Sequence, residues 1–358
     1  MTISKLDSKS LSLGLSFDDV LIVPAYSEVI PSEVSLQTSI AKDFFLDLPI
    51  LSAAMDTVSE RDMGIVMSKA GGMAVIHKNL SIQEQAAEVA AVKAAGGRVG
   101  AAIGTAADAI ERGDALISAG ADAIFVDTAH GHSKNVGNVV KNLRAKYPDL
   151  IIVAGNIATA DGALFLKDMG ASAVKVGIGP GSICTTRVVS GCGYPQLSAI
   201  HDVARALDGL IPVIADGGIR ESGDMVKALA AGASAVMIGS MLAGTAETPG
   251  EIFKVGDVKY KNYRGMGSIA AMKKGSADRY AQQNVEHKKL VAEGIEAFVK
   301  YKGEASDLLE KMRGGIQSGM GYAGAKTIGE LWEKARFVQI TSAGIAESHP
   351  HSVIQMKD

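Results

Sequence analysis

Cysteine and aromatic residues are scarce in this chain of 358 residues, which has only 2 cysteines and 5% aromatic residues. Two cysteines cannot build the disulfide framework of a small secreted protein, so we expect a reducing compartment, the cytoplasm. No run of about 18 apolar residues is present, which argues against a membrane-spanning helix. The N-terminus also lacks the continuous apolar core of a secretory signal.

A charge excess of either sign is also missing, because 36 Lys and Arg face 39 Asp and Glu, a formal net charge of -3. This balance argues against a broad basic surface for nucleic acid or membrane lipid, so any phosphate site must be local. Glycine, in contrast, is abundant, with 41 residues. So many glycines indicate many tight turns between strands and helices.

Short β-branched runs that end in glycine or a polar residue recur along the chain, and Ala-rich helical stretches separate them. We predict eight strands, at 49–53, 72–78, 99–104, 123–129, 150–157, 173–179, 212–218 and 235–240. Helices are expected between most of them, for example over 161–170 and 222–232, with glycine at their C-terminal ends.

Continuous apolar strands that alternate with helices are typical of a parallel sheet buried on both faces. Eight such units predict a single α/β domain over residues 1–358, a (β/α)8 TIM barrel. A doubly wound sheet is the alternative. The absence of a Gly-x-Gly-x-x-Gly turn after the first strand argues against it.

The strand–helix rhythm breaks after the eighth strand. Residues 251–320 form a long polar stretch interrupted by glycines, followed by a closing helix expected around 327–336. A long irregular insertion at the catalytic end of a barrel is typical of a lid, with a packed surface hairpin as the alternative.

Barrel active sites lie at the C-terminal ends of the strands, where this chain concentrates glycine and polar residues. The turns Gly217-Gly218 and Gly239-Ser240 follow the last two strands and can bring backbone N–H groups onto a phosphate. Asp216, just before them, can accept hydrogen bonds from sugar hydroxyls. The pattern predicts a nucleoside monophosphate site, unless both turns are ordinary left-handed turns.

The loop GIGPGSICTT (177–186) places Cys184 outside any regular element, where a thiol can ionise and attack an electrophilic carbon. A packing role for Cys184 is the alternative. The glycines leave carbonyl groups free to surround a monovalent cation. Cys192, in contrast, is interpreted as a small hydrophobic residue.

Within the expected lid, residues 263–268 can lay backbone amides along a planar base. Arg279-Tyr280 places a guanidinium beside a phenol. Since an arginine is rarely a base, the residues alone indicate a solvated pair or an anion clamp.

Taken together, these segments resemble the inosine-5′-monophosphate dehydrogenase family over nearly the whole chain. The resemblance rests on the following segments: FDDVLIVP (17–24), PILSAAMDTV (49–58), AVIHKN (74–79), DTAHGHS (127–133), AGNIAT (154–159), GIGPGSICTTR (177–187), ADGGIR (215–220), MIGSMLAGT (237–245), YRGMGS (263–268), GSADRY (275–280), EGIE (293–296) and SAGIAESH (342–349).

The resemblance implies that Cys184 attacks C2 of the hypoxanthine of inosine monophosphate (IMP), that hydride passes to NAD⁺, and that a covalent intermediate is then hydrolysed. It also implies nucleotide contacts from Ser52, Met55, Ser182, Asp216, Gly218, Gly239, Ser240, Tyr263, Gly265, Met266 and Gly267. Residues implied near the dinucleotide are Asp127, Thr128, His130, Asn156 and Gly177.

The resemblance further implies a K⁺ ion bound by carbonyls of Gly179, Gly181 and Cys184 and by Glu347, Ser348 and His349 of a neighbouring subunit, hence a homotetramer. It changes the interpretation of Arg279-Tyr280: the lid closes after hydride transfer, and Arg279 activates the hydrolytic water. Thr186 and Glu293 resemble an accessory proton relay. Such chemistry requires partial desolvation of the guanidinium.

The chain also departs from the family pattern. Residues 94–97 directly join the second barrel helix to the third strand, where the family usually inserts a pair of nucleotide-binding CBS modules, so regulation through such modules should be absent. Ala292 and Lys300 stand where the family often has proline. Cys192 and Tyr194 occupy positions commonly taken by valine.

Two alternatives remain. GMP reductase shares the barrel and the cysteine loop but uses NADPH, and the Arg279-Tyr280 pair with residues 127–133 favours the dehydrogenase. A non-catalytic nucleotide-binding barrel is the other alternative. The loop thiol, the lid arginine and the C-terminal cation ligands together argue against it.

Overall fold

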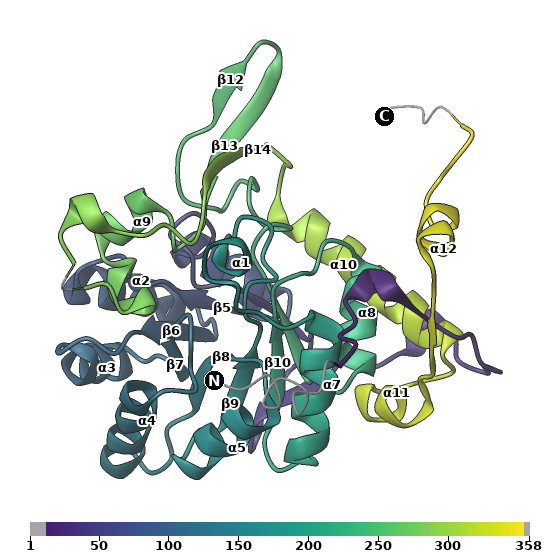
Figure 1. The fold of residues 1–358 in the computed structure, drawn as a ribbon, viewed down its shortest axis with the longest axis horizontal. Helices are drawn as coiled ribbons and strands as arrows, with labels where there is room; N and C mark the ends of the chain where they lie inside the picture. Colours follow the sequence, from purple (N-terminus) through teal and green to yellow (C-terminus); the bar gives the residue numbers. More distant parts are fainter. Residues whose placement is uncertain (1–11, 284, 354–358) are drawn as a thin grey trace, which may run out of the picture.

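The computed structural model describes residues 12–283 and 285–353, so the outermost parts of the predicted domain 1–358 lie outside the described residues. The described chain closes eight parallel strands into a barrel, in the order β10-β11-β4-β5-β6-β7-β8-β9. They are β4 (Ile50–Ser52), β5 (Met73–Ile76), β6 (Val99–Ile103), β7 (Ala123–Asp127), β8 (Ile152–Ile157), β9 (Ala173–Val176), β10 (Val213–Asp216) and β11 (Ala235–Ile238). The predicted TIM barrel is confirmed (Figure 1).

Helices surround the barrel, as the alternating pattern predicted. The helices of the ring are α1 (Arg61–Lys69), α2 (Ile82–Ala94), α3 (Ala109–Ser118), α4 (Lys134–Lys146), α5 (Ala160–Asp168), α7 (Gln196–Leu207), α8 (Ser222–Ala230) and α10 (Ala305–Tyr322). A short additional helix, α6 (Thr186–Ser190), lies in the connection between β9 and α7.

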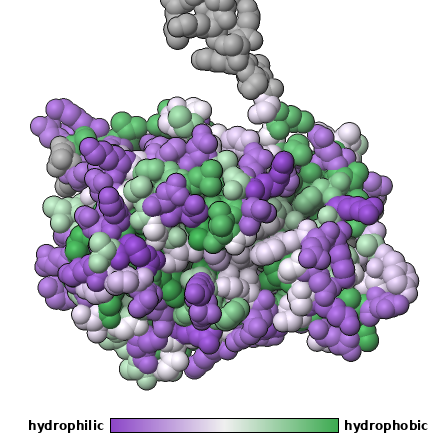
Figure 2. All heavy atoms as spheres, turned by 90° about the horizontal axis from the view of Figure 1, so that it is seen from below, coloured by the Kyte–Doolittle hydropathy of each residue, from purple (hydrophilic) through white to green (hydrophobic). Residues whose placement is uncertain are grey.

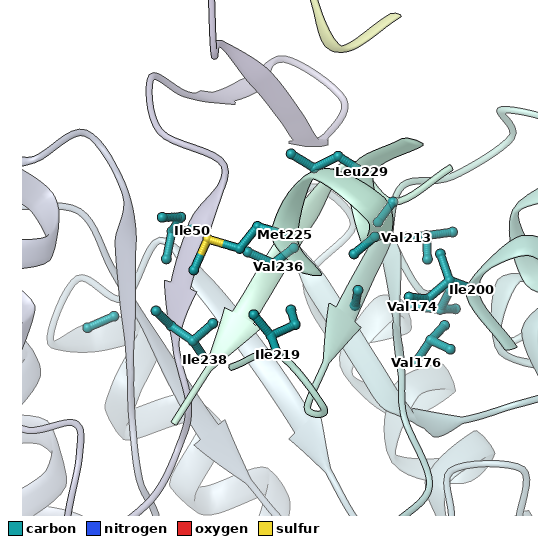
Figure 3. Packing of buried hydrophobic residues seen from close by; sticks show 14 of the residues in the cluster. Ile50, Val174, Val176, Ile200, Val213, Ile219, Met225, Leu229, Val236 and Ile238 are labelled. Carbon is teal, nitrogen blue, oxygen red and sulfur yellow. The ribbon is translucent and has the colours of Figure 1, made fainter. Parts of the chain in front are cut away.

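Alternate strand residues face two different cores. In β11, Val236 and Ile238 belong to the same buried cluster as Met225 of α8, and Figure 3 shows Val236 beside Met225. Met237, between them in sequence, belongs instead to the cluster inside the barrel, together with Ile214 of β10. Because successive strand residues point to opposite faces, a buried strand with helices outside needs apolar residues at every position. This is why the strands read as continuous apolar runs.

The N-terminal end of the barrel is closed by a hairpin of β2 (Thr38–Ala41) and β3 (Phe44–Leu46). Ile40 and Leu46 of this hairpin are fully buried against the barrel interior. The hairpin is tied to the segments that precede the strands, since Arg98 donates to the Phe45 carbonyl at 2.6 Å. A ligand can therefore reach the barrel axis only from the C-terminal ends of the strands.

The connection from α2 to β6 is a tight turn. Gly97 N–H donates to the Val92 carbonyl at 3.0 Å, and Gly96 N–H donates to the Lys93 carbonyl at 2.9 Å. Gly96 has a φ of +74°, a conformation that favours glycine. The four residues 94–97 thus bridge helix and strand with no room for a further module.

The long insertion after β11 is built mainly from a small antiparallel sheet and short helices. Its elements are β12 (Phe253–Val255), β13 (Val258–Arg264), α9 (Ile269–Lys274), η4 (Ser276–Tyr280), η5 (His287–Lys289) and β14 (Glu296–Lys300). β13 lies between β12 and β14. Figure 1 shows the β12–β13 hairpin projecting from the barrel, while α9 lies above its rim.

Helix α10 changes the expected boundary of this insertion. Residues 251–320 were expected to be one insertion closed by a helix around 327–336, but α10 begins at Ala305 and packs against α8 and α1. Its apolar residues Leu309, Met312 and Ile316 follow helical spacing and are buried. The last helix of the barrel ring is therefore α10, and the insertion after β11 ends before it.

The chain ends outside the ring. Helix α11 (Ile328–Lys334) packs on α8, β15 (Phe337–Gln339) pairs with β1 (Val20–Ile22), and α12 (Ser342–Glu347) follows. Two short turns, η2 (Phe17–Asp19) and η3 (Pro31–Glu33), flank β1. Figure 2 shows hydrophilic and hydrophobic residues interspersed over one face of the molecule. Among the described helices, none combines the length and apolar character needed to cross a bilayer.

Candidate active site

A cavity of about 320 Å³ opens at the C-terminal ends of the barrel strands. Its wall includes Cys184 from the loop after β9, Gly218 after β10 and Gly239 after β11, with Arg279 and Glu293 from the insertion. The loop thiol and the two glycine turns, which the sequence placed in one site, thus line the same cavity.

The cysteine loop turns sharply because glycine occupies its critical positions. Gly177 has a φ of +154°, and a side chain there would collide with the Asp216 carbonyl. Cys184 N–H donates to the Gly181 carbonyl at 3.1 Å, which closes the turn that presents the thiol. The Cys184 thiol donates to the Thr186 hydroxyl at 3.2 Å. Thr186 can therefore exchange a proton with the sulfur.

The insertion is hydrogen-bonded directly to this loop. Thr185 N–H donates to the Glu293 carbonyl at 2.9 Å, and Ile295 N–H donates to the Ile183 carbonyl at 3.0 Å. Glu293 N–H donates in turn to the Gly267 carbonyl at 3.0 Å. Residues 293–295 therefore lie between the cysteine loop and the 265–267 segment, and both are held in place by backbone contacts.

A buried lysine organises the floor of the cavity. Lys175 of β9 is 3% exposed, and its Nζ lies 2.8 Å from Asp127 Oδ1 and 2.5 Å from Asp216 Oδ2. The Asn156 amide donates to Asp216 Oδ2 at 2.9 Å and to the Gly177 carbonyl at 2.8 Å. One cation thus lies between two carboxylates that would otherwise repel each other, and Arg279 supplies a second positive charge to Asp127.

Sequence reasoning did not identify Lys175. A lysine inside the apolar run AVKVG was the available signal, since a charge in a fully buried strand needs a partner. Gln196 was also missed: its amide donates to the carbonyls of Val176 at 2.9 Å and Asp216 at 3.1 Å. Gln196 begins α7 and supports the ends of two neighbouring strands at the cavity.

Arg279, which belongs to the insertion after β11, is held by a barrel carboxylate. Arg279 of η4 forms an ion pair with Asp127, and Ala129 N–H donates to the Arg279 carbonyl at 2.9 Å. Both side chains are largely buried, with 14% and 6% exposure. Burial raises the pKa of Tyr280, an effect that the neighbouring Arg279 partly offsets. Tyr280 therefore remains a neutral phenol beside a fixed guanidinium.

Tyr263 of β13 projects from the insertion into the site. A side chain on Gly239 would come within 3.3 Å of the Tyr263 hydroxyl, so glycine leaves room for the phenol beside the second glycine turn. Burial raises the pKa of Tyr263 to about 12, and the Asp216 charge acts in the same direction, while a hydrogen bond to Ser182 opposes them.

Most of the expected site residues line this cavity. Those on its wall are Met55, Asp127, Asn156, Gly177, Gly179, Gly181, Ser182, Cys184, Thr186, Asp216, Gly218, Gly239, Ser240, Tyr263, Gly265, Met266, Gly267, Arg279, Tyr280 and Glu293. They come from the ends of several strands and from the insertion, as the barrel architecture predicts.

Three expected contact residues lie off the wall. The Ser52 hydroxyl is buried and 2.6 Å from the Ser59 hydroxyl, and the Thr128 hydroxyl donates to the Gly155 carbonyl at 2.9 Å. His130 is exposed outside the cavity. Ser52 and Thr128 use their polar groups to brace the strand ends, so the structure gives them a supporting position.

The proposed cation ligands fall into two groups. Gly179, Gly181 and Cys184 are on the cysteine loop, whereas Glu347, Ser348 and His349 are exposed at the end of α12, away from the cavity wall. Glu347, Ser348 and His349 therefore do not line the cavity with the cysteine loop of the same chain.

Free carbonyl groups on the loop suit a cation. Within the described residues, the carbonyl oxygens of Gly179 and Cys184 accept no hydrogen bond, while that of Gly181 accepts one from the Cys184 amide. Unpaired backbone carbonyls are hard oxygen donors of the kind that alkali-metal ions bind. The residues present therefore fit such an ion.

Comparisons with known proteins agree with this geometry. A family model described as the IMP dehydrogenase / GMP reductase domain matches residues 14–351. An inosine-5′-monophosphate dehydrogenase from Cryptosporidium parvum is 45% identical, with 99% of this chain and 98% of the relative covered. A protein of the same name from Borreliella burgdorferi is 44% identical, with 98% and 100% covered.

A third relative differs in length. The inosine-5′-monophosphate dehydrogenase from Streptococcus pyogenes is 42% identical over 480 aligned positions, which cover 98% of this chain and 97% of the relative. The alignment is longer than the 358 residues of this chain, so the streptococcal protein contains residues that this chain lacks. With the barrel, the cysteine loop and matches over nearly its full length, the chain belongs to the IMP dehydrogenase / GMP reductase family.

Proposed function

We propose that this chain oxidises IMP to xanthosine 5′-monophosphate with NAD⁺, through a covalent intermediate on Cys184. The observation that carries the proposal is one cavity that holds the loop thiol, both glycine turns and the lid arginine. The named relatives are dehydrogenases of this kind and match almost end to end. The activity would supply guanine nucleotide biosynthesis.

In the first half-reaction, the Cys184 thiol releases its proton to solvent, the thiolate attacks C2 of the purine, and the hydride leaves C2 for NAD⁺. The turns at Gly218 and Gly239 hold the phosphate with backbone N–H groups, and Asp216 accepts hydrogen bonds from the ribose. Backbone groups of residues 265–267 contact the base. NAD⁺ accepts the hydride when it is bound beside C2.

Asp127, Asn156 and Gly177 are proposed to bind the dinucleotide. All three line the cavity, but in this structure the Asp127 carboxylate forms an ion pair with Arg279. Since Arg279 pairs with Asp127 Oδ2 and lines the same cavity, the guanidinium and a ribose hydroxyl would compete for this carboxylate. The lid and the dinucleotide are thus expected to alternate at this position.

In the second half-reaction, water attacks C2 and the Cys184 thiolate leaves, with Arg279 and Tyr280 positioned to orient and activate the water. The relay through Thr186 and Glu293 is supported by the 3.2 Å contact between the Cys184 sulfur and the Thr186 hydroxyl. The proton released by water leaves through one of these two routes.

The lid is proposed to be the insertion between β11 and α10, with the catalytic barrel forming the rest of a single domain without CBS modules. K⁺ is proposed on the carbonyls of Gly179, Gly181 and Cys184, completed by Glu347, Ser348 and His349 of a neighbouring subunit in a homotetramer. There the ion would stabilise the shape of the cysteine loop. We place the protein in the cytoplasm.

The test mixes the protein with IMP, NAD⁺ and K⁺ and follows NADH absorbance. Formation of NADH and of xanthosine monophosphate supports the proposal. GMP reductase activity is the second candidate, because the matching family model covers both enzymes. Oxidation of NADPH with GMP, without NADH formation from IMP, would instead assign the reductase activity. If neither assay shows activity, a non-catalytic nucleotide-binding protein would be favoured.

A further inference from the structure

Lys78 and Asp278 form a buried ion pair between the barrel and the lid. Lys78 lies in the loop after β5, and Asp278 belongs to η4, 200 residues further along the chain. Their side chains are 8% and 7% exposed. An ion pair buried between these two segments exists only when the lid lies on the barrel.

The same barrel loop holds the lid at two further points. Lys78 Nζ donates to the Gly275 carbonyl at 3.1 Å, and the Asn79 amide donates to the Ala271 carbonyl at 3.2 Å. The Asn79 amide also reaches Asp56 Oδ2 at 3.1 Å. Residues 78–79 therefore contact α9, the glycine that follows it and η4.

The neighbouring strand end leaves space for this pair. Gly104 follows β6, and a side chain at Gly104 would collide with the Asp278 carboxylate and come within 3.2 Å of Lys78 Nζ. Burial lowers the pKa of Lys78, with Asp278 as the main opposing influence and Arg279 and Arg112 as further unfavourable charges. Lys78 thus depends on Asp278 to remain a cation in this position.

Neither residue of the pair lines the substrate cavity, yet Asp278 directly precedes Arg279. We propose that Lys78 and Asp278 form a latch that holds the lid closed and places Arg279 and Tyr280 for hydrolysis. They are positioning residues, and the inference rests on the proposed function. It extends that function by naming what selects the closed lid.

The Lys78–Asp278 latch is expected to affect only hydrolysis, because the ion pair stabilises only the closed state of the lid. When the lid opens, both charges return to water and the pair adds nothing. Removing one partner leaves the other charge buried without compensation, which selectively raises the free energy of the closed state. Hydride transfer, which takes place before Arg279 is needed, should be spared.

The experiment compares Lys78→Met, Asp278→Leu and the double variant in the holoenzyme with IMP, NAD⁺ and K⁺. Rapid-mixing absorbance measures the initial NADH burst, and the later linear phase measures hydrolysis. We expect each single variant to retain the burst and to lose at least about tenfold in the linear phase. Intact mass should then show covalent intermediate on Cys184.

Partial recovery in the double variant is the second expected result, because it leaves no lone buried charge. Lys78→Arg, which keeps the cation, should stay closest to the parent. Lys93→Met is the matched control: it removes another Lys–Asp pair, whose Nζ–Oδ1 distance is 2.8 Å, on the outside of the barrel. It should leave the ratio of burst to linear phase unchanged.

Hydrogen exchange of residues 268–283 provides a readout independent of turnover, and these amides should exchange faster in Lys78→Met than in Lys93→Met. Equal loss of burst and linear phase, simple additivity in the double variant, or unchanged lid exchange would each overturn the latch. A parent protein that produces no NADH from IMP would instead refute the proposed function, while the exchange comparison would still test the latch.

Discussion

Arg279 and Lys175 pair with the two different oxygens of a single carboxylate, that of Asp127. Lys175 Nζ lies 2.8 Å from Oδ1, and the Arg279 guanidinium pairs with Oδ2. Lys175 belongs to the barrel and is fixed, whereas Arg279 is carried by the insertion. This arrangement makes Asp127 the point where the lid meets the charged floor of the site.

Cys184→Ala should abolish NADH formation and leave IMP affinity within a few-fold of the parent, because the sulfur forms the covalent bond while the glycine turns hold the nucleotide. Absorbance at the NADH band and calorimetric titration with IMP measure the two quantities. Cys192→Ala is the control, since Cys192 is exposed and lies off the cavity wall. Normal turnover in Cys184→Ala would falsify the nucleophile assignment.

Arg279→Ala should spare the NADH burst and slow the linear phase by a factor on the order of 10² to 10⁴, the range typical of a lost acid–base group. Quenched samples should contain enzyme heavier by one covalently bound nucleotide. Lys289→Ala, an exposed lid substitution, should behave like the parent. Disappearance of the burst in Arg279→Ala would place Arg279 in the first half-reaction.

Lys175→Met should destabilise the fold by about 3–5 kcal/mol, because two carboxylates would lose the buried cation that pairs with them. It should also weaken IMP binding, since Asp216 loses its fixed orientation. Urea unfolding and IMP titration measure the two effects. Lys146→Met breaks an exposed pair with Asp114 and should change the free energy of unfolding far less than Lys175→Met. Similar costs for both variants would contradict the role of Lys175.

Tyr263 makes a specific prediction for alkaline pH. Its pKa is raised to about 12 in the folded protein from an ordinary value of 10.0, so the native state holds this proton more tightly than the unfolded state. The stabilisation is complete below pH 10 and is lost as pH rises from about 10 to 12.

Tyr263→Phe should therefore lose less stability than the parent over that interval, by up to about 2–3 kcal/mol. Unfolding in urea at several pH values from 8 to about 12 tests this difference, and Tyr322→Phe, at an exposed position, serves as control. If the free energy of unfolding changes with pH in the same way for Tyr263→Phe and the parent, Tyr263 does not have the raised pKa assigned to it.

Replacing K⁺ with Li⁺ should reduce turnover severalfold, because carbonyls at fixed positions on a tight loop cannot close around a much smaller ion. Steady-state rates at constant ionic strength with each chloride salt measure the effect. Equal rates with K⁺ and Li⁺ would argue against a cation on the carbonyls of Gly179 and Cys184.

Much of the fold could be predicted because its signals are local. Each barrel strand is an apolar run that ends in glycine or a polar residue, and residues that follow strands must meet at one end of a closed barrel. Cys184, Gly218 and Gly239 were therefore placed together correctly. Helix α10 was not predicted, because Gly314, Gly315 and Gly319 interrupt its sequence, and packing against α8 outweighs their weak helix propensity.

The sequence by itself determined the barrel, the loop that carries the thiol and the glycine turns beside it, since periodicity and turn chemistry are properties of neighbouring residues. Only the tertiary structure decided that Lys175 serves both Asp127 and Asp216, and that Lys78 meets Asp278 across 200 positions. Side chains of opposite charge are common throughout the chain, so composition cannot specify which of them pair. Pairing is fixed by the shape of the buried space in which desolvated charges must find partners.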